Sequence, residues 1–103
     1  MSGWHRVCHI DDLPDSKPIP IEVDDYEIIL VRQGDKVFCL RDRCSHEEFP
    51  LSLGTVDGGR ICCKAHGAEF DLATGKVLKA PALVPVKTYE VRIEGGEVFV
   101  SIE

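Results

Sequence analysis

Short apolar or alternating runs, separated by glycine and proline, make up most of this 103-residue chain outside one central stretch. Runs of this kind are typical of β-strands, and they predict strands at residues 4–10, 19–23, 26–32 and 36–41. Residues 28–31 are continuously apolar, so the third strand should be covered on both faces, in the middle of the fold. Prolines 14, 18 and 20 exclude a helix from residues 11–20, and no other stretch has a convincing helical pattern.

Glycine-containing turns predict how these strands pair. A tight turn at Gly34 and Asp35 would set Val31 opposite Phe38 and Ile29 opposite Leu40. Further hairpins are expected about Gly58–Gly59, between strands 55–57 and 60–62, and about Gly95–Gly96, between strands 87–94 and 97–102. The last hairpin would pair Ile93 with Val98, Val91 with Val100 and Tyr89 with Ile102. With a turn at Thr74–Gly75 and a short strand at 76–78, the pattern predicts an all-β fold built on antiparallel strands from both chain ends.

The strand periodicity stops after Arg43, where the stretch CSHEEFPLSLGTVDGGRICCKAHGAEF begins at Cys44 and ends at Phe70. It contains two close Cys/His pairs, Cys44 with His46 and Cys63 with His66. Thiolate and imidazole pairs at such spacing suit a metal held between two loops. Structural zinc sites prefer Cys pairs two to four residues apart, so this pattern fits zinc poorly.

Two Cys and two His in this order resemble the Rieske centre, in which two Cys hold one iron and two His hold the other. Further residues stand at the family's places, namely Leu51, Gly54, Gly67, Phe70, Asp71, Thr74, Gly75 and Pro81. In overall size the chain resembles the small Rieske ferredoxins that feed electrons to bacterial ring-hydroxylating dioxygenases. The resemblance implies a Rieske fold, with an antiparallel β-sandwich or barrel-like base at 1–43 and 72–103 and an inserted cluster-binding subdomain of two loops at 44–71.

The resemblance also implies the function. One 2Fe-2S cluster, held by Cys44 and Cys63 on the inner iron and His46 and His66 on the outer iron, would make the chain a one-electron carrier and not an enzyme. A flavin-dependent NAD(P)H reductase would be its donor, and a Rieske non-haem iron oxygenase of aromatic catabolism its acceptor. Pro81 would lie beside the cluster. No residue plays general acid, base or nucleophile convincingly.

Composition limits the partners and the cellular compartment to be expected for this protein. Eighteen acidic and twelve basic side chains leave a net charge of −6, which argues against nucleic acid and anionic membrane as partners. Glu47, Glu48 and Glu69 are candidates for steering a basic protein partner. Three cysteines remain beyond the cluster, Cys8, Cys39 and Cys62, and an odd remainder fits a reducing compartment better than a disulfide framework. No run is long and apolar enough to span a membrane, so a cytoplasmic monomer is expected.

Some alternatives stay open. The chain would also suit a small Rieske subunit of an assimilatory nitrite reductase or another oxidoreductase complex, and a structural zinc module is a further reading. Cys62 precedes the predicted ligand directly, and Lys64 stands where the family usually has proline, so Cys62 and Cys63 compete for the ligand position. The spacing to His66 favours Cys63.

The resemblance carries one expectation about redox potential. High-potential Rieske proteins add a disulfide between the two loops, and a Ser and a Tyr that donate hydrogen bonds to sulfur. The matching positions here are Phe49 and Ala65 for the disulfide, Ala68 for the Ser and Phe70 for the Tyr. Because hydrogen bonds to sulfur favour the reduced cluster, their absence predicts a potential near the lower end of the Rieske range, falling further at alkaline pH.

Overall fold

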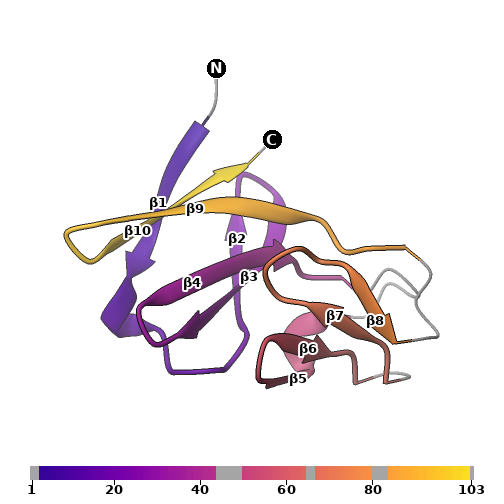
Figure 1. The fold of residues 1–103 in the computed structure, drawn as a ribbon. Coiled ribbons are helices and arrows are strands. Elements are labelled where there is room, and N and C mark those ends of the chain that lie inside the picture. Colours follow the sequence, from indigo (N-terminus) through magenta and orange to yellow (C-terminus); the bar gives the residue numbers. More distant parts are fainter. Residues whose placement is uncertain (1–2, 44–49, 65–66, 80–83, 103) are drawn as a thin grey trace.

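The structure, a computed structural model, describes residues 3–43, 50–64, 67–79 and 84–102 (Figure 1). It contains two antiparallel sheets. The larger has the strand order β1-β10-β9-β4-β3-β2 and the smaller the order β5-β6-β7-β8. The larger sheet is formed by β1 (Gly3–His9), β2 (Ile19–Val23), β3 (Tyr26–Gln33), β4 (Lys36–Arg41), β9 (Thr88–Glu94) and β10 (Glu97–Ile102). The smaller is formed by β5 (Thr55–Asp57), β6 (Arg60–Cys62), β7 (Glu69–Asp71) and β8 (Val77–Lys79).

The all-β prediction is confirmed for the described parts of the chain, whose only helical elements are two 3₁₀ turns, η1 (Ile10–Asp12) and η2 (Leu51–Leu53). None of these elements is long and apolar enough to cross a lipid bilayer. Strands from both ends of the chain meet in the larger sheet, where β1 pairs with β10. Its strands curl into a nearly closed, barrel-like base (Figure 1).

The β3–β4 hairpin has the predicted register, with Val31 opposite Phe38 and Ile29 opposite Leu40. Residues 28–31 of β3 are all fully buried, which confirms that this strand is covered on both faces. Successive side chains of a strand point to opposite faces, so Ile28 and Leu30 enter one apolar cluster while Ile29 and Val31 enter another.

The C-terminal hairpin confirms two of the three predicted pairs, Ile93 with Val98 and Val91 with Val100. The ladder between β9 and β10 ends at Glu90 and Ser101, so it does not include the expected pair of Tyr89 with Ile102. Tyr89 pairs instead with Cys39 on the other side of β9. β9 therefore pairs with β10 along one edge and with β4 along the other, and this joins the two halves of the base.

Two predictions about strands were wrong. The regular alternation expected for residues 4–10 is broken by a register shift between Arg6 and Cys8, which brings both Val7 and Cys8 against the same core. Glu69 and Phe70, expected in the second cluster loop, form β7 together with Asp71, and this strand pairs with β6 and β8. A strand of three residues is too short to show a period in the sequence.

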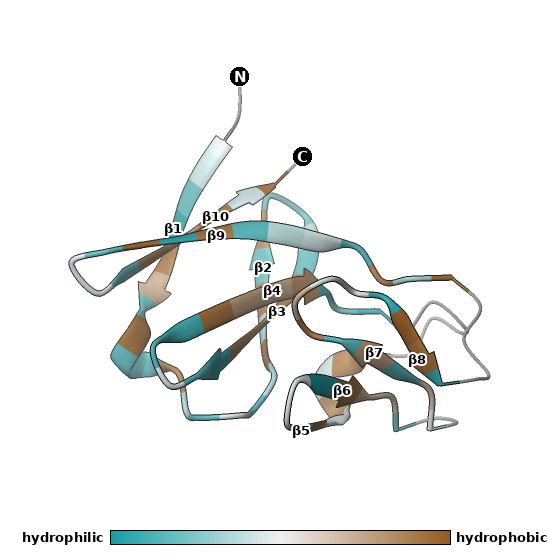
Figure 2. Ribbon diagram, in the orientation of Figure 1, coloured by the Kyte–Doolittle hydropathy of each residue, from teal (hydrophilic) through white to brown (hydrophobic). Residues whose placement is uncertain are grey.

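Two clusters of buried side chains hold the fold together. The first, here called the base core, lies among the strands of the larger sheet and contains Leu13, Val23, Ile28, Leu30, Val37, Cys39, Val98, Val100 and Ile102. The second, here called the junction core, joins the two sheets and contains Ile29, Val31, Leu40, Leu51, Ile61, Cys63, Ala68, Phe70, Leu72 and Val86. Figure 2 shows the hydrophobic residues of β3 and β4, the strands that contribute to both cores.

Candidate metal centre

One end of the smaller sheet gathers the stems of the predicted metal loops. The strand registers place Thr55 beside Cys62, Cys62 beside Glu69, and Glu69 beside Lys79. These four residues therefore form one row across the sheet. The first loop returns to the sheet just before Thr55, the second connects Cys62 to Glu69, and the segment with Pro81 leaves after Lys79. The topology thus brings to one end three segments that are far apart in sequence.

The stem of the second loop is a tight turn. The Cys63 amide donates to the Ala68 carbonyl at 2.6 Å, and the Gly67 amide donates to the Cys63 carbonyl at 2.9 Å. Gly67 has φ +78°, a conformation that favours glycine. These bonds fix the backbone of Cys63 at the end of β6.

The stem of the first loop is fixed on both sides of residues 44–49. Before the loop, the Arg41 amide donates to the Lys87 carbonyl and the Asp42 amide to the Glu27 carbonyl, both at 2.9 Å. After the loop, Leu51 of η2 is fully buried in the junction core. Gly54 then passes so close to the next strand that a Cβ there would lie 2.1 Å from the Cys62 carbonyl oxygen. Glycine is therefore required where the two loop stems meet.

Gly75 and Val86 lie close together on the two sides of the segment that carries Pro81. The Val86 amide donates to the Gly75 carbonyl at 2.9 Å, and a Cβ on Gly75 would lie 2.0 Å from the Val86 carbonyl oxygen. Asp71 supports the preceding turn by accepting from the Thr74 amide at 3.0 Å and the Thr74 hydroxyl at 2.7 Å. The predicted turn at Thr74–Gly75 is confirmed, and the strand after it begins one residue later than expected.

Of the four predicted ligands, Cys63 lies in the described part of the chain, and Cys44, His46 and His66 lie outside it. Pro81 and the acids Glu47 and Glu48 also lie outside. No cluster of three or more metal-binding side chains occurs in residues 3–43, 50–64, 67–79 and 84–102. The ligand set therefore stays a prediction. The observations that bear on it are the surroundings of Cys63 and the contacts of the loop stems.

The two adjacent cysteines have different environments. Cys63 is 1% exposed and packs in the junction core, whereas Cys62 is half-buried in the outer strand position beside Glu69. The Cys62 thiol donates to the Cys63 carbonyl at 3.8 Å, along its own chain. Lys64, where the family usually has proline, is exposed. A buried thiol at the start of a loop is the better placed of the two to bind a group held inside that loop.

Comparison with known proteins decides the family. Residues 3–90 match the model of the Rieske [2Fe-2S] domain, which is most of the chain. This chain belongs to the Rieske family. Members of this family bind one 2Fe-2S cluster, in which thiolate and imidazole ligands hold the two irons.

Two curated Rieske relatives match almost the full length. The chain is similar to the 3-phenylpropionate/cinnamic acid dioxygenase ferredoxin subunit of Escherichia coli (strain K12), with 35% identity over 93% of this chain and 91% of the relative. It is also similar to the ferredoxin component of biphenyl 2,3-dioxygenase of Rhodococcus jostii (strain RHA1), with 33% identity over 95% of this chain and 92% of the relative.

Solved structures agree in fold. The ferredoxin of carbazole 1,9a-dioxygenase from Nocardioides aromaticivorans IC177 matches with a TM-score of 0.94 and 33% identity, over 97% of this chain and 98% of that one. A chain in a complex of reduced oxygenase and oxidized ferredoxin of carbazole 1,9a-dioxygenase matches with a TM-score of 0.89, 33% identity, and coverage of 95% and 92%. A nitrite reductase small subunit of Mycobacterium tuberculosis has a TM-score of 0.87 over 100% of this chain and 97% of that one, but at 22% identity it shares the fold alone.

The surroundings of Cys63 fit a Rieske cluster. A soft sulfur donor that is shielded from water suits iron, and a buried anionic cluster is favoured where the backbone of tight turns lies close by. Ala68 and Phe70, the residues at the places of the family's Ser and Tyr, are both fully buried in the same core. Neither side chain has a hydroxyl to donate to sulfur.

The remaining cysteines of the Rieske chain have structural surroundings. Cys39 is 2% exposed in the base core, and its burial raises the pKa of the thiol to about 12. Burial also raises the pKa of Cys8. Both thiols are therefore neutral and poorly reactive at neutral pH.

Of the three acids proposed to steer a partner, Glu69 is the one described. Its carboxylate is 3.0 Å from the Arg60 guanidinium, and its side chain is 19% exposed. A paired and half-covered carboxylate contributes less to the long-range field than a free one. Any steering by acids near the loops therefore depends more on Glu47 and Glu48.

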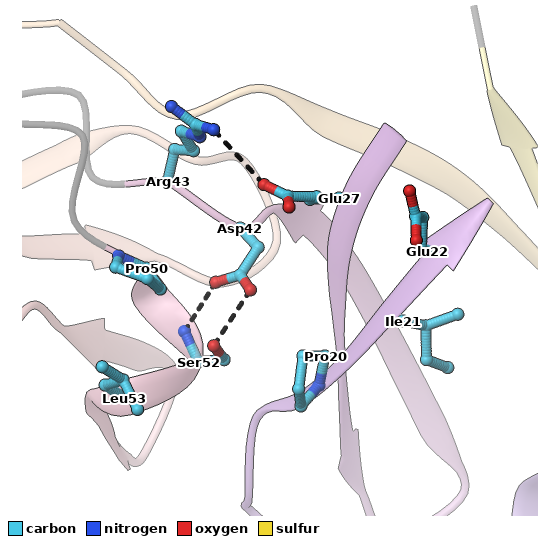
Figure 3. Close-up of a pocket in the computed structure, with 9 residues that line it drawn as sticks. All are labelled: Pro20, Ile21, Glu22, Glu27, Asp42, Arg43, Pro50, Ser52 and Leu53. Atoms are coloured by element: carbon cyan, nitrogen blue, oxygen red, sulfur yellow. Dashed lines mark hydrogen bonds and ion pairs between the residues drawn. The ribbon is translucent and has the colours of Figure 1, made fainter. Parts of the chain in front are cut away.

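Asp42 and Ser52 are residues of the site that the sequence reasoning missed. Asp42 is 8% exposed and accepts two hydrogen bonds from Ser52 (Figure 3). Both lie on the wall of a surface groove of about 650 Å³, beside Pro50 and Leu53. The position of Asp42, two residues before the predicted ligand Cys44, was the one sign in the sequence that could have pointed to it. Its burial could not be predicted, because aspartate is mostly an exposed residue.

Proposed function

We propose that this Rieske protein is a soluble one-electron carrier that delivers electrons to a Rieske non-haem iron oxygenase acting on aromatic compounds. The main support for this proposal is the similarity to ferredoxin components of aromatic dioxygenases, which extends over more than nine-tenths of both chains. An electron carrier needs a cluster and a docking surface. The bound cluster supplies the reversible uptake of one electron.

In this proposal the ligands are Cys44 and Cys63 on one iron and His46 and His66 on the other. This proposal is supported by the row that the strand registers form from Thr55, Cys62, Glu69 and Lys79. The first loop ends at this row, and the second loop and the segment with Pro81 begin there. The cluster-binding subdomain is 44–71 and the base is 1–43 with 72–103. The smaller sheet reaches beyond that boundary to β8, through its pairing with β7.

The partners follow from the same comparison. The acceptor is the oxygenase component, as in the complex of oxygenase and ferredoxin of carbazole 1,9a-dioxygenase. We propose that a flavin-dependent NAD(P)H reductase is the donor and that the carrier is a monomer in the cytoplasm.

A low redox potential is part of the proposal. Ala68 and Phe70 surround the Cys63 region with apolar groups, so hydroxyl donors to sulfur are missing at those two positions. Without such bonds the negative charge of the reduced cluster is less stabilised, and the potential belongs near the lower end of the Rieske range, which spans roughly −150 to +300 mV. A nicotinamide-dependent reductase can reduce such a centre.

The deciding experiment is reconstitution of electron flow. The purified holoprotein, a flavin reductase and NADH are combined with Rieske oxygenases from the same cell, and in parallel with its nitrite reductase. We expect product formation by an oxygenase that depends on the carrier, and none by nitrite reductase. Carrier-dependent reduction of nitrite, with no oxygenase responding, would overturn the proposal.

Steering by the loop acids has its own test. Replacing Glu47 and Glu48 together by Gln should lower the association rate with the oxygenase severalfold at low salt, and added salt should remove the difference. The matched control replaces Asp24 and Asp25 by Asn at the turn between β2 and β3, which changes the net charge equally and suits their positive φ values. An equal loss in the control would assign the effect to net charge alone.

A further inference from the structure

A buried carboxylate joins the two ends of the first cluster loop. Asp42 follows β4 directly, and Ser52 lies in η2, on the far side of residues 44–49. Asp42 Oδ1 accepts from the Ser52 amide at 2.7 Å, and Asp42 Oδ2 accepts from the Ser52 hydroxyl at 2.9 Å. Figure 3 shows both oxygens turned toward Ser52. A carboxylate that is 8% exposed would be costly to bury without such donors.

Both partners are fixed to different parts of the protein. The Asp42 amide donates to the Glu27 carbonyl at 2.9 Å, which ties Asp42 to β3 of the base. Ser52 follows Leu51, whose side chain is fully buried in the junction core. The bonds between them therefore connect the base to η2.

Two other carboxylates in the described chain make the same pair of bonds without closing a loop. Asp15 accepts from the Gly34 amide at 2.9 Å and the Ser16 hydroxyl at 3.1 Å, at an exposed position in the base. Asp71 accepts from Thr74, three residues away, within one turn. Of these three carboxylates, that of Asp42 is buried. Its bonds join two residues that are ten positions apart in the sequence, and Cys44 and His46 lie between them.

We propose that Asp42 and Ser52 form a positioning clip that holds the first cluster loop closed and so determines how firmly the cluster is retained. The clip acts on both loops, because two residues after Ser52 comes Gly54, which contacts the Cys62 carbonyl next to Cys63. When the clip opens, the two direct bonds between the stems are lost, while Asp42 keeps its backbone bond to Glu27 and Leu51 stays buried. In this proposal the cluster is then retained less firmly.

The inference rests on the Rieske cluster and not on the identity of the donor or acceptor. Its readout is therefore loss of the cluster, measured without any partner. The visible absorbance of the oxidised holoprotein is followed in excess iron chelator for the wild type, Asp42→Ala, Ser52→Ala, Ser52→Thr and Asp15→Ala. The last variant is the matched control, because it removes an equivalent pair of bonds, from Ser16 and Gly34, and leaves the bonds between Asp42 and Ser52 in place.

We expect Ser52→Ala to lose the cluster about tenfold faster than the wild type and Asp42→Ala faster still, since hydrogen bonds to a buried charge are worth more than one neutral bond. Ser52→Thr keeps the hydroxyl and should restore most of the retention. Asp15→Ala should match the wild type. Unfolding of the base, followed by the fluorescence of Trp4 in β1, should be alike in Ser52→Ala and wild type.

Two results would overturn the clip. One is cluster loss at the wild-type rate in Ser52→Ala and Asp42→Ala. The other is equally fast loss in Ser52→Ala and Ser52→Thr, or in Asp15→Ala, which would point to a general loss of stability. If Asp42→Ala does not fold, the comparison of Ser52→Ala with Ser52→Thr decides by itself.

Discussion

The base core and the junction core are built from different lengths of strand. The base core lies among strands of five to eight residues, contributed by both ends of the chain. The junction core covers β5, β6, β7 and β8, each of three residues, and its members include the predicted ligand Cys63. Such short strands form few ladder hydrogen bonds, so they depend on packing against β3 and β4 and on whatever the loops bind.

The base and the smaller sheet therefore have different sources of stability. The base can be held by its own ladders and apolar contacts, because its strands pair continuously across the larger sheet. We expect a bound cluster to stabilise the smaller sheet, since metal binding at a site made of loops is coupled to the ordering of those loops. The following predictions test this division.

Removing the cluster should affect the smaller sheet far more than the base. After treatment with chelator and reductant, the amides of Ile61 and Phe70 should exchange with solvent faster by about 100-fold or more, because local opening becomes easy. Amides of Leu30 and Val100 should change little. Hydrogen exchange followed by mass spectrometry checks this, and an equal rise in exchange in both sheets would contradict the division.

Two fully buried leucines, Leu30 in the base core and Leu51 in the junction core, provide a matched pair of substitutions. Leu30→Ala should lower the free energy of unfolding by about 2–5 kcal/mol in both holoprotein and apoprotein, since it leaves a cavity in the base. Leu51→Ala should cost a similar amount in the holoprotein and much less in the apoprotein. Denaturant titrations followed by Trp4 fluorescence and visible absorbance measure both. A full cost for Leu51→Ala in the apoprotein would show that its region stays packed without the cluster.

A smaller effect concerns the buried thiol of the base. Burial raises the pKa of Cys39 to about 12 in the fold, so the native protein keeps this proton after the unfolded chain has lost it. The native state then binds more protons, and its stability, full below the unfolded thiol's pKa, falls as the pH rises toward 12. Between pH 8 and 10, Cys39→Ala should flatten the decline in the free energy of unfolding by about 1 kcal/mol. An unchanged slope would show that Cys39 does not contribute.

The fold was predictable from the sequence where strands are long. The pairing of Val31 with Phe38 followed from one turn and one apolar run, and so did the burial of residues 28–31 on both faces. β7 was missed because three residues carry no period, and the irregularity near Val7 was missed because a bulge leaves the composition of a strand unchanged.

The candidate ligands were proposed from the sequence and stay a prediction, whereas the residues that support the loops were not found there. Cys63 was singled out by its spacing to His66. Asp42, Ser52 and the close approach of Gly54 to Cys62 were not, because they depend on contacts between residues eight or more positions apart. Such contacts are decided by how the two sheets pack, which no local pattern records.

The most direct test of the account compares Cys62→Ser with Cys63→Ser by electron paramagnetic resonance of the reduced proteins. A hydroxyl cannot replace a soft thiolate on iron, so Cys63→Ser should lose the Rieske signal and the visible absorbance. Cys62→Ser should keep both, because its side chain is half-buried and lies outside the junction core. A signal that survives in Cys63→Ser and vanishes in Cys62→Ser would contradict the ligand set and the placement of the cluster at this end of the smaller sheet.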